Sequence, residues 1–266
     1  MDEAPSNTET LFAHERPDAD APQITVVVPL YNYADFVIET LDSVARQTMS
    51  GLDLVVVDDR STDDSAAVAC RWMKDNQSRF RRATVLRHLA NSRLAKTRNT
   101  GFSAAATNFV FPLDADNTLY PTCLEKLHRA LAGSPAAFAY CMLERFLTPD
   151  GAEPEQHVMN IHPWRPETLA AGNKIDAMVL LRRSVWEKVH GYTLTMPCQG
   201  WEDYDLWFKI ARAGGDGVQV PQILARYRVH RNSMLHTETN AQKNVPQLLS
   251  YLRSSYPEFY DPPDAE

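Results

Sequence analysis

The stretch Ile24-Thr25-Val26-Val27-Val28, residues 24–28, decides the fold, because it is a continuous run of apolar and β-branched side chains. A run without polar alternation is typical of a strand that is buried on both faces. The residues that follow place Phe36, Leu41 and Val44 on one face at helical spacing. The ordered part of the chain is therefore predicted to begin with a strand and then a helix.

Three further strand patterns follow in the first half of the chain, with helical patterns between them. We expect strands at residues 54–57, 83–86 and 109–113, and helices at 66–73, 94–106 and from Pro121 onward. Strands that alternate with helices pair in parallel through right-handed crossovers. The sequence thus predicts an α/β fold, a single Rossmann-like domain with an open, mainly parallel central sheet flanked by helices. Ligands of such sheets bind beyond the carboxyl ends of the strands.

The second half of the chain is less regular. Residues 147–175 contain four prolines and are expected to form a long loop, of the kind that is either a functional lid or a disordered segment. Beyond this loop the pattern predicts a strand at 177–181, a helix at 183–190, a helix opening within 200–207, short strands at 218–220 and 223–229, and a closing helix through Leu252.

Composition and charge exclude several classes of protein. The 266 residues carry a net charge of −7, which argues against nucleic acid as the main partner, because phosphate binding is driven by clustered Lys and Arg. The four cysteines have no CxxC spacing, so neither a zinc site nor a disulfide framework is indicated. We therefore expect a cytoplasmic protein.

The first 21 residues are acidic, with six carboxylates against Arg16 alone. They lack the basic start and apolar centre of a signal peptide, and residues 1–21 are expected to be a disordered tail. No later segment approaches the roughly 20 apolar residues that cross a bilayer. Any membrane contact would then be peripheral.

The segment Asp114-Ala115-Asp116-Asn117 places two carboxylates at the end of a predicted strand. Such an arrangement suits Mg²⁺ or Mn²⁺, which bind through one or two carboxylates plus substrate phosphates. A calcium loop is an alternative, but Leu119 stands where that loop needs glycine. The other alternative is a helix N-cap formed by Asn117 or Thr118, which would leave the two aspartates unexplained.

Two other polar clusters follow predicted strands, at residues 29–32 and 58–61, and should face the same crevice as the aspartates. Asp58 and Asp59 could stabilise the start of a helix through its dipole, or accept a hydrogen bond from a nucleotide base or ribose. Tyr31 could stack on that base or be a partly buried core residue. The sequence leaves these alternatives open.

Glu202 and Asp203 follow Trp201 and precede an amphipathic helical pattern. They are either acidic residues of a helix's first turn or the place of a general base, which would remove the proton of an attacking hydroxyl. His230 lies among arginines, in Arg226-Tyr227-Arg228-Val229-His230-Arg231. Cationic side chains at a strand end would stabilise a departing diphosphate.

Taken in order, these motifs resemble those of the family 2 glycosyltransferases of the GT-A fold, across roughly residues 22–235. The resemblance rests on six segments, at residues 26–32, 55–63, 98–101, 113–117, 200–207 and 227–230. It implies a division into the tail 1–21, a GT-A domain at 22–235 and a C-terminal helix and tail at 236–266.

The resemblance implies an enzyme that moves a sugar from a nucleotide diphosphate sugar, with a UDP-sugar favoured, to a hydroxyl of a glycan, lipid-linked or small-molecule acceptor. Matching positions place the donor against Pro29, Tyr31, Asn32, Asp59, Arg98, Asp114 and Ala115. By the same resemblance, Asp59 would face a uracil-type base, and Asp114 would face the donor ribose or a metal-bound water.

The metal and the base are likewise implied by the resemblance. Asp116 would be the direct ligand of Mn²⁺ or Mg²⁺, with Asp114 beside it and His230 as a third ligand. Asp203 would be the general base of an inverting reaction, and Glu202 would orient the acceptor. The chain departs from the family pattern at Arg60, where glycine is frequent, in Asn91-Ser92-Arg93, which lacks the glycine common before the Arg-Asn motif, and at Asn117, often a third aspartate.

Two other functions compete with this interpretation. The first is a sugar-nucleotide-binding or scaffold domain that keeps the fold without turnover, and retention of Asp116 and Asp203 counts against it. The second is a nucleotidyltransferase, which would normally have a glycine-rich phosphate loop where this chain has Pro29-Leu30-Tyr31-Asn32.

Overall fold

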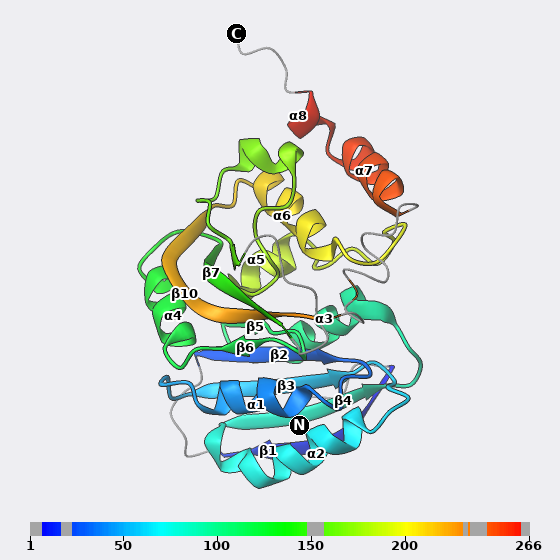
Figure 1. Ribbon diagram of the computed structural model, residues 1–266, viewed down its shortest axis with the longest axis vertical. Helices are drawn as coiled ribbons and strands as arrows, with labels where there is room; N and C mark the ends of the chain where they lie inside the picture. Colours follow the sequence, from blue (N-terminus) through cyan, green and yellow to red (C-terminus); the bar gives the residue numbers. More distant parts are fainter. Residues whose placement is uncertain (1–6, 17–22, 148–156, 231–233, 235–243, 262–266) are drawn as a thin grey trace.

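The computed structural model describes residues 7–16, 23–147, 157–230, 234 and 244–261 (Figure 1). One ten-stranded sheet runs through it, in the order β1-β4-β3-β2-β5-β9-β7-β10-β6, with β8 paired to β7. The strands are β1 Thr8–Glu15, β2 Ile24–Leu30, β3 Leu52–Asp58, β4 Arg82–His88, β5 Phe109–Pro112, β6 Thr118–Leu119, β7 Phe138–Leu147, β8 Val158–Met159, β9 Val179–Arg182 and β10 Gly217–Val229.

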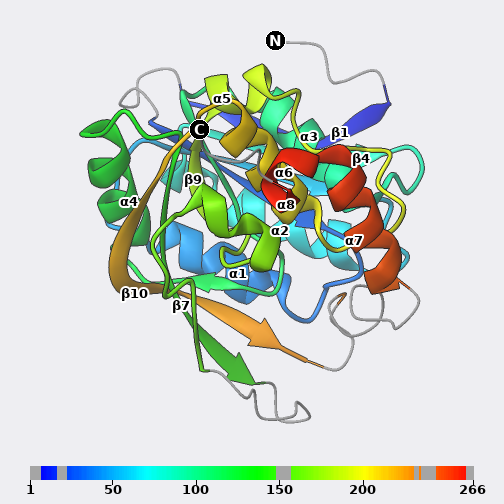
Figure 2. The same ribbon diagram turned by 90° about the horizontal axis from the view of Figure 1, so that it is seen from above.

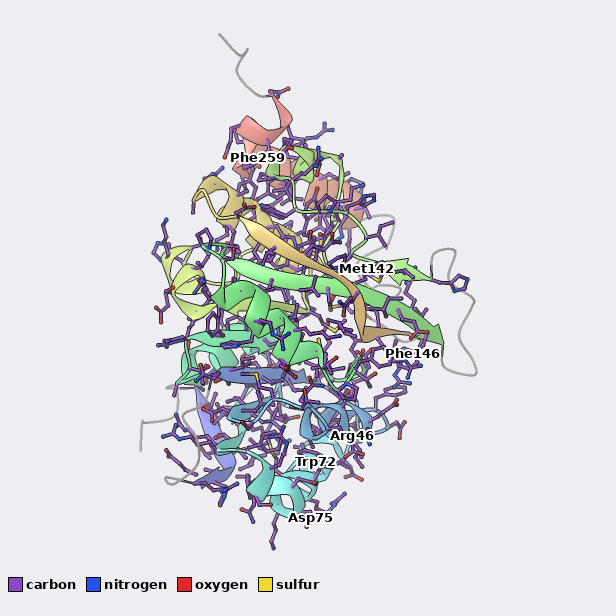
Figure 3. The ribbon with its side chains drawn as sticks, turned by 90° about the vertical axis from the view of Figure 1, so that its left-hand side faces the viewer. Arg46, Trp72, Asp75, Met142, Phe146 and Phe259 are labelled. Carbon is purple, nitrogen blue, oxygen red and sulfur yellow. The ribbon has the colours of Figure 1, made fainter. Side chains whose placement is uncertain are left out.

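Helices lie on both faces of this sheet, as Figures 1 and 2 show. The α-helices are α1 Val37–Ala45, α2 Ser65–Asn76, α3 Arg93–Ala104, α4 Cys123–Ala132, α5 Arg183–Lys188, α6 Glu202–Arg212, α7 Asn244–Ser255 and α8 Pro257–Tyr260, and the 3-10 helices are η1 Gln77–Arg79 and η2 Pro166–Ala171. In Figure 3, Trp72 of α2 and Phe259 of α8 mark opposite ends of the molecule. Within the described residues, no helix is long and apolar enough to cross a membrane.

The centre of the sheet confirms the predicted parallel α/β arrangement. Strand β2 pairs in parallel with β3 and β5, and β3 pairs in parallel with β4. Every residue of β2 is buried, because alternate side chains enter two different cores. Val26 and Val28 pack in the core that contains α1 and α2, whereas Val27 packs in the core that contains α3 and α6.

Helix α3 lies so close to the sheet that it requires a glycine. A Cβ atom built on Gly101 would come within 2.2 Å of Val27 Cγ1. The close approach fixes where α3 begins relative to the ends of β2 and β3, and these ends carry the polar clusters singled out in the sequence.

Strand β1 corrects the prediction of a disordered tail at residues 1–21. Thr8–Glu15 pairs antiparallel with β4, from Thr8 opposite His88 to Glu15 opposite Arg82. The composition of this segment hides the strand, because the stabilising contacts are main-chain hydrogen bonds to β4 and ion pairs from Glu15 to Arg81 and Arg82 at 3.6 and 3.9 Å. The rest of the predicted tail lies largely outside the described residues.

The second half of the chain also differs from its predicted pattern. The two short strands expected near 218–229 are one strand, β10, which continues through Pro221 with a shift in register between Val220 and Ile223. The predicted long loop at 147–175 contains β8 and η2, and its residues 148–156 lie outside the described part. The closing helix is present as α7, followed by the short α8.

Candidate functional site

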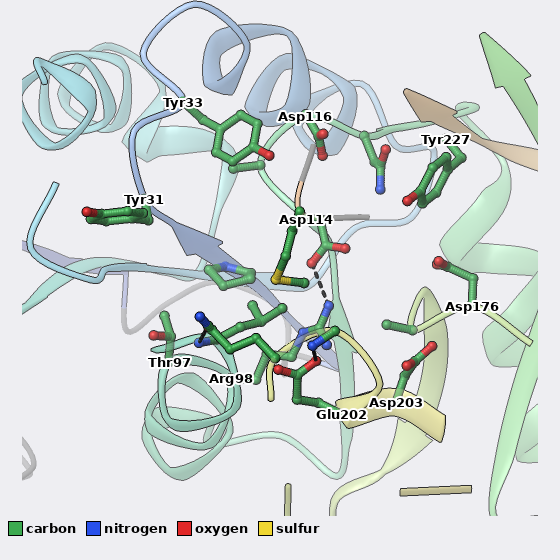
Figure 4. Close-up of a pocket in the computed structure, with 18 of the residues that line it drawn as sticks. Tyr31, Tyr33, Thr97, Arg98, Asp114, Asp116, Asp176, Glu202, Asp203 and Tyr227 are labelled. Atoms are coloured by element: carbon green, nitrogen blue, oxygen red, sulfur yellow. Dashed lines mark hydrogen bonds and ion pairs between the residues drawn. The ribbon is translucent and has the colours of Figure 1, made fainter. Parts of the chain in front are cut away.

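A cavity of about 1190 Å³ opens at the carboxyl ends of β2, β3 and β5 (Figure 4). Residues 29–32 and 114–117 line it together with Asp59 of the cluster at 58–61, so these residues face one crevice as predicted. The cavity brings together every site residue predicted from the sequence, namely Pro29, Tyr31, Asn32, Asp59, Arg98, Asp114, Ala115, Asp116, Glu202, Asp203 and His230.

Asp116 and His230 form one corner of this cavity. His230 Nε2 lies 3.1 Å from Asp116 Oδ2, and both residues are buried. Burial raises the pKa of Asp116, while the hydrogen bond with His230 opposes that rise. The rings of Tyr33 and Phe36 pack against the imidazole, with centroids 5.7 and 5.2 Å away. The corner thus presents a carboxylate oxygen and an imidazole nitrogen, both ligand types of divalent cations.

The carboxylate of Asp114 forms an ion pair with Arg98. Arg98 Nη2 lies 2.7 Å from Asp114 Oδ1, and the Arg98 side chain is only 4% exposed. Burial alone would lower the pKa of Arg98, but Asp114, Tyr192 and Glu202 together outweigh it, so this pKa is raised. Within the described residues, no group of three His, Cys, Asp or Glu side chains could hold a metal ion. Of the three residues predicted to bind a metal, Asp116 and His230 lie next to each other, whereas Asp114 pairs with Arg98.

The alternative structural interpretations of the aspartate segment do not match what is observed. Helix α4 begins at Cys123 with Thr122 as its N-cap residue, so neither Asn117 nor Thr118 caps it. Instead, Asn117 Oδ1 accepts the main-chain N–H of Arg228 at 2.8 Å. Because a strand, β5, precedes the segment, the helical entry of a calcium loop is also missing.

Asp59 joins three elements of the fold at the cavity wall. Its Oδ1 atom lies 2.6 Å from His88 Nδ1 and accepts the Ser92 N–H at 2.7 Å, while its Oδ2 atom accepts the Arg93 N–H at 2.8 Å. On its other side, His88 Nε2 lies 2.9 Å from the Thr100 hydroxyl. Asp59 therefore satisfies free donors at the start of α3 and leaves one acceptor position, on Oδ2, for a ligand. The predicted link to a helix dipole exists, but with α3 and not with the next helix, α2.

Two arginines in the predicted motif loops, Arg60 and Arg93, adopt a left-handed backbone conformation. Arg60 has φ of 66° and Arg93 has φ of 69°, and Asn32 joins them at 56°. Residues other than glycine rarely take this backbone conformation, so these loops have a geometry that glycine usually provides. Tyr31, next to this turn, is 43% exposed, so the alternative of a core tyrosine is wrong. Its ring is free to stack on a planar ligand.

Asp203 and Glu202 occupy the first turn of α6. Asp203 Oδ2 accepts a hydrogen bond from Asn173 Nδ2 at 2.9 Å, and its Oδ1 accepts the Tyr204 N–H at 2.8 Å. Glu202 accepts the Gly200 N–H at 2.9 Å and is 4% exposed. Burial raises the pKa of both carboxyls, and Arg98 opposes the rise in each case. A raised pKa makes Asp203 a stronger base than an ordinary carboxylate.

The predicted cationic strand end is only partly present. The Arg228 side chain donates to the main-chain oxygen of Asp116 at 2.8 Å and pairs with Glu39. Arg226 stacks over Phe146 at 4.0 Å, and neither arginine is among the described residues that line the cavity. Arg231 lies outside the described residues. Among the described basic residues of that segment, His230 is the one that lines the cavity.

Sequence reasoning did not single out Asp176, which lies on the cavity wall beside Asp203 (Figure 4). Burial, with Asp114 and Asp203 adding to it, raises the pKa of Asp176 to about 7. No motif marks this residue in the sequence, because it lies in an irregular segment between η2 and β9. A single aspartate in such a segment is a common turn residue.

A family model described as glycosyl transferase family 2 matches residues 25–190. Among curated proteins, the uncharacterized glycosyltransferase EpsJ of Bacillus subtilis is 33% identical over 106 residues, which cover 40% of this chain and 29% of EpsJ. The putative glycosyltransferase EpsE of the same organism is 23% identical over 217 residues, covering 80% of this chain and 74% of EpsE. The chain thus aligns with less than a third of the length of EpsJ.

Solved structures show the same fold at low sequence identity. S. aureus TarS 1-349 in complex with UDP-GlcNAc has 15% identity and a TM-score of 0.69, over 92% of this chain and 68% of that one. The mannosyltransferase PcManGT from Pyrobaculum calidifontis, in complex with GDP-Man and Mn²⁺, has 21% identity and a TM-score of 0.60, over 80% of this chain and 59% of that one. These likenesses confirm the predicted GT-A fold.

Proposed function

Because this chain belongs to glycosyl transferase family 2, we propose that it transfers a sugar from a nucleotide diphosphate sugar to an acceptor hydroxyl. The observation that carries the proposal is a single cavity with two chemically different ends. One end holds the Asp116–His230 corner, the other holds the half-buried carboxylate of Asp203, and the Arg98–Asp114 pair lies between them (Figure 4).

The donor would lie along the first of these ends. Tyr31 offers an exposed ring for the base, and Asp59 keeps one acceptor position that suits the imino N–H of a uracil-type base. Two of the structural neighbours are complexes with UDP-GlcNAc and UDP. A UDP-sugar is therefore the favoured donor, although the GDP-Man complex of PcManGT makes a guanine nucleotide the other one to test.

A divalent cation fits the corner formed by Asp116 and His230. The corner has one carboxylate and one imidazole, and the oxygens of a bound diphosphate would add further ligands of the type that Mn²⁺ and Mg²⁺ accept. When bound, the cation would stabilise the negative charge of the leaving diphosphate. Arg98, with its pKa raised by Asp114, keeps a permanent positive charge beside that position.

Asp203 would act as the general base. The acceptor hydroxyl oxygen attacks the anomeric carbon of the donor sugar, and its proton passes to Asp203. The bond between the anomeric carbon and the diphosphate oxygen breaks, and the diphosphate leaves with the electron pair. A single in-line displacement inverts the anomeric configuration. Asn173 and the Tyr204 N–H hold the carboxylate in place for this step.

The proposal is tested by thermal shift with UDP-GlcNAc, UDP and GDP-mannose, each with and without Mn²⁺, because a ligand of the native state raises its apparent stability. We expect a Mn²⁺-dependent shift with one nucleotide. Asp116→Ala should abolish the Mn²⁺ dependence, whereas Asp216→Ala, at an exposed carboxylate outside the cavity, should not. Absence of a shift with every nucleotide sugar would contradict the proposal.

Turnover separates an enzyme from a binding domain of the same fold. Positioned acid-base catalysis contributes about 10²–10⁴-fold, so Asp203→Asn should slow release of UDP from the preferred donor by that factor while nucleotide binding is kept. Equal, slow donor breakdown by wild type and Asp203→Asn would instead indicate a non-catalytic sugar-nucleotide-binding domain.

A further inference from the structure

Asp176 is held in place by one hydrogen bond from its main chain and one to its side chain. Its main-chain N–H donates to Asn160 Oδ1 at 2.9 Å, and its own Oδ1 accepts the Met178 N–H at 2.9 Å. Within the described residues, the second carboxylate oxygen has no hydrogen-bond partner. Asp176 lines the cavity (Figure 4).

The residue that fixes Asp176 is itself a strained and buried one. Asn160 has φ of 57° and is 4% exposed. Its side-chain Nδ2 donates to the Cys141 oxygen on β7 at 3.1 Å, and its main-chain oxygen accepts from Gln219 Nε2 at 2.7 Å. Left-handed backbone in a residue other than glycine costs about 1 kcal/mol or more and persists where the surroundings fix it. Hydrogen bonds between Asn160 and the strands β7 and β10 thus hold Asp176 in position.

The wall around Asp176 faces the proposed base. Asp176 and Asp203 lie near each other on this wall (Figure 4), and Asp203 contributes, after burial and Asp114, to the raised pKa of Asp176. Asp176 likewise contributes, after burial, to the raised pKa of the Tyr227 hydroxyl. In Figure 4, Asp176 lies between Tyr227 and Asp203, on the side of the cavity away from Tyr31. A molecule whose hydroxyl is to be deprotonated by Asp203 would lie against this wall.

We propose that Asp176 binds the acceptor, with its cavity-facing oxygen accepting hydrogen bonds from the hydroxyls of a neutral sugar. The inference rests on the proposed function and adds the class of acceptor to it. At a pH above its raised pKa of about 7, the Asp176 carboxylate is ionised, and an ionised carboxylate is an acceptor with several lone-pair positions that suit adjacent hydroxyls of a sugar ring. Asp176, Asp203 and Glu202 together would repel an anionic group placed directly between them.

The test uses the full chain with UDP and Mg²⁺ bound, and a panel of methyl α- and β-glycosides of glucose, galactose, mannose and N-acetylglucosamine as probes. Saturation-transfer NMR measures their affinity. Asp176→Asn keeps the oxygen that accepts the Met178 N–H and removes the charge that faces the cavity. Asp216→Asn is the matched control, since Asp216 Oδ1 also accepts a neighbouring main-chain N–H, that of Gly217, at 2.8 Å but outside the cavity.

We expect Asp176→Asn to bind the best glycoside at least about tenfold more weakly, as hydrogen bonds to charged groups are worth that much or more. Its UDP affinity and melting temperature should match those of the wild type, and Asp216→Asn should bind glycosides normally. Equal glycoside binding by Asp176→Asn, or UDP binding without glycoside binding in the wild type, would overturn this inference alone. Absence of nucleotide binding in the wild type would refute the proposed function and this inference with it.

Discussion

The hydrogen bonds to the buried carboxylate of Asp205 lead to a specific prediction about stability. Asp205 is fully buried on α6, and three hydroxyls donate to it: Tyr256 at 2.6 Å and Tyr251 at 2.9 Å to Oδ1, and Thr193 at 2.6 Å to Oδ2. Two of these donors come from the C-terminal segment, so the carboxylate joins that segment to α6. Proximity to Asp205, after burial, raises the pKa of the Tyr256 hydroxyl, which keeps it protonated as a donor.

Replacing Tyr256 by Phe removes the hydroxyl and little else. The ring, which stacks on Phe208 with centroids 4.8 Å apart, is kept. A hydrogen bond to a charged group contributes about 1.5–3 kcal/mol, and two donors to Asp205 remain, so we expect a loss of roughly 2 kcal/mol at pH 7. In a chain of this size, that loss lowers the melting temperature by about 4–8 °C.

The control for this substitution is Tyr120→Phe. The Tyr120 hydroxyl donates to Glu144 at the same 2.6 Å, but the Glu144 side chain is 42% exposed, so water replaces the lost bond. We expect a loss under about 0.5 kcal/mol. Both variants are compared with the wild type by urea and thermal unfolding. If Tyr256→Phe costs no more than Tyr120→Phe, the reasoning about Asp205 is wrong.

Three further predictions concern the framework of the site. Burial raises the pKa of Asp53 to about 6, above the value near 3.9 of an unfolded chain, so the folded state binds more protons between these values. The free energy of unfolding of the wild type should therefore rise by up to roughly 2–3 kcal/mol relative to that of Asp53→Asn as the pH falls from 7 to 4. Urea unfolding at each pH measures this difference, and the same pH dependence in both proteins would contradict the reasoning. Gly101→Ala should lower the free energy of unfolding by about 1–3 kcal/mol or more, because the new methyl group would clash with Val27. Unchanged unfolding in urea would show that α3 can shift. Arg60→Gly should leave the melting temperature unchanged or raise it, since φ is 66° there, whereas Arg71→Gly inside α2 should cost about 1 kcal/mol; equal losses would argue against strain at Arg60.

Much of the parallel core could be predicted because its signal is local. The apolar runs of β2 and β3 are buried along their whole length, and the polar residues after them can only lie at the carboxyl edge of the sheet. Strand β1 could not be predicted in this way. Its residues form a strand because β4 offers an open edge 67 residues or more further along the chain, and no local pattern records that edge.

The site shows the same division between local and distant information. Motifs placed Asp116, Asp203 and His230 in one cavity, but not the partners that define their chemistry. The pairing of Asp114 with Arg98 depends on the position of α3, and Asp176 is set by Asn160 across the sheet. These contacts join residues that are not recognisable as a pair in the sequence.

Strand β1 also bears on how the protein behaves in concentrated solution. The family match begins at residue 25, so a chain trimmed to that boundary would lose Thr8–Glu15 and leave the outer edge of β4 without a partner. An unpaired strand edge is a template for adding a strand from another molecule. Thr8–Glu15 thus covers the edge of β4, and we expect a chain trimmed to residue 25 to self-associate more readily than the full chain.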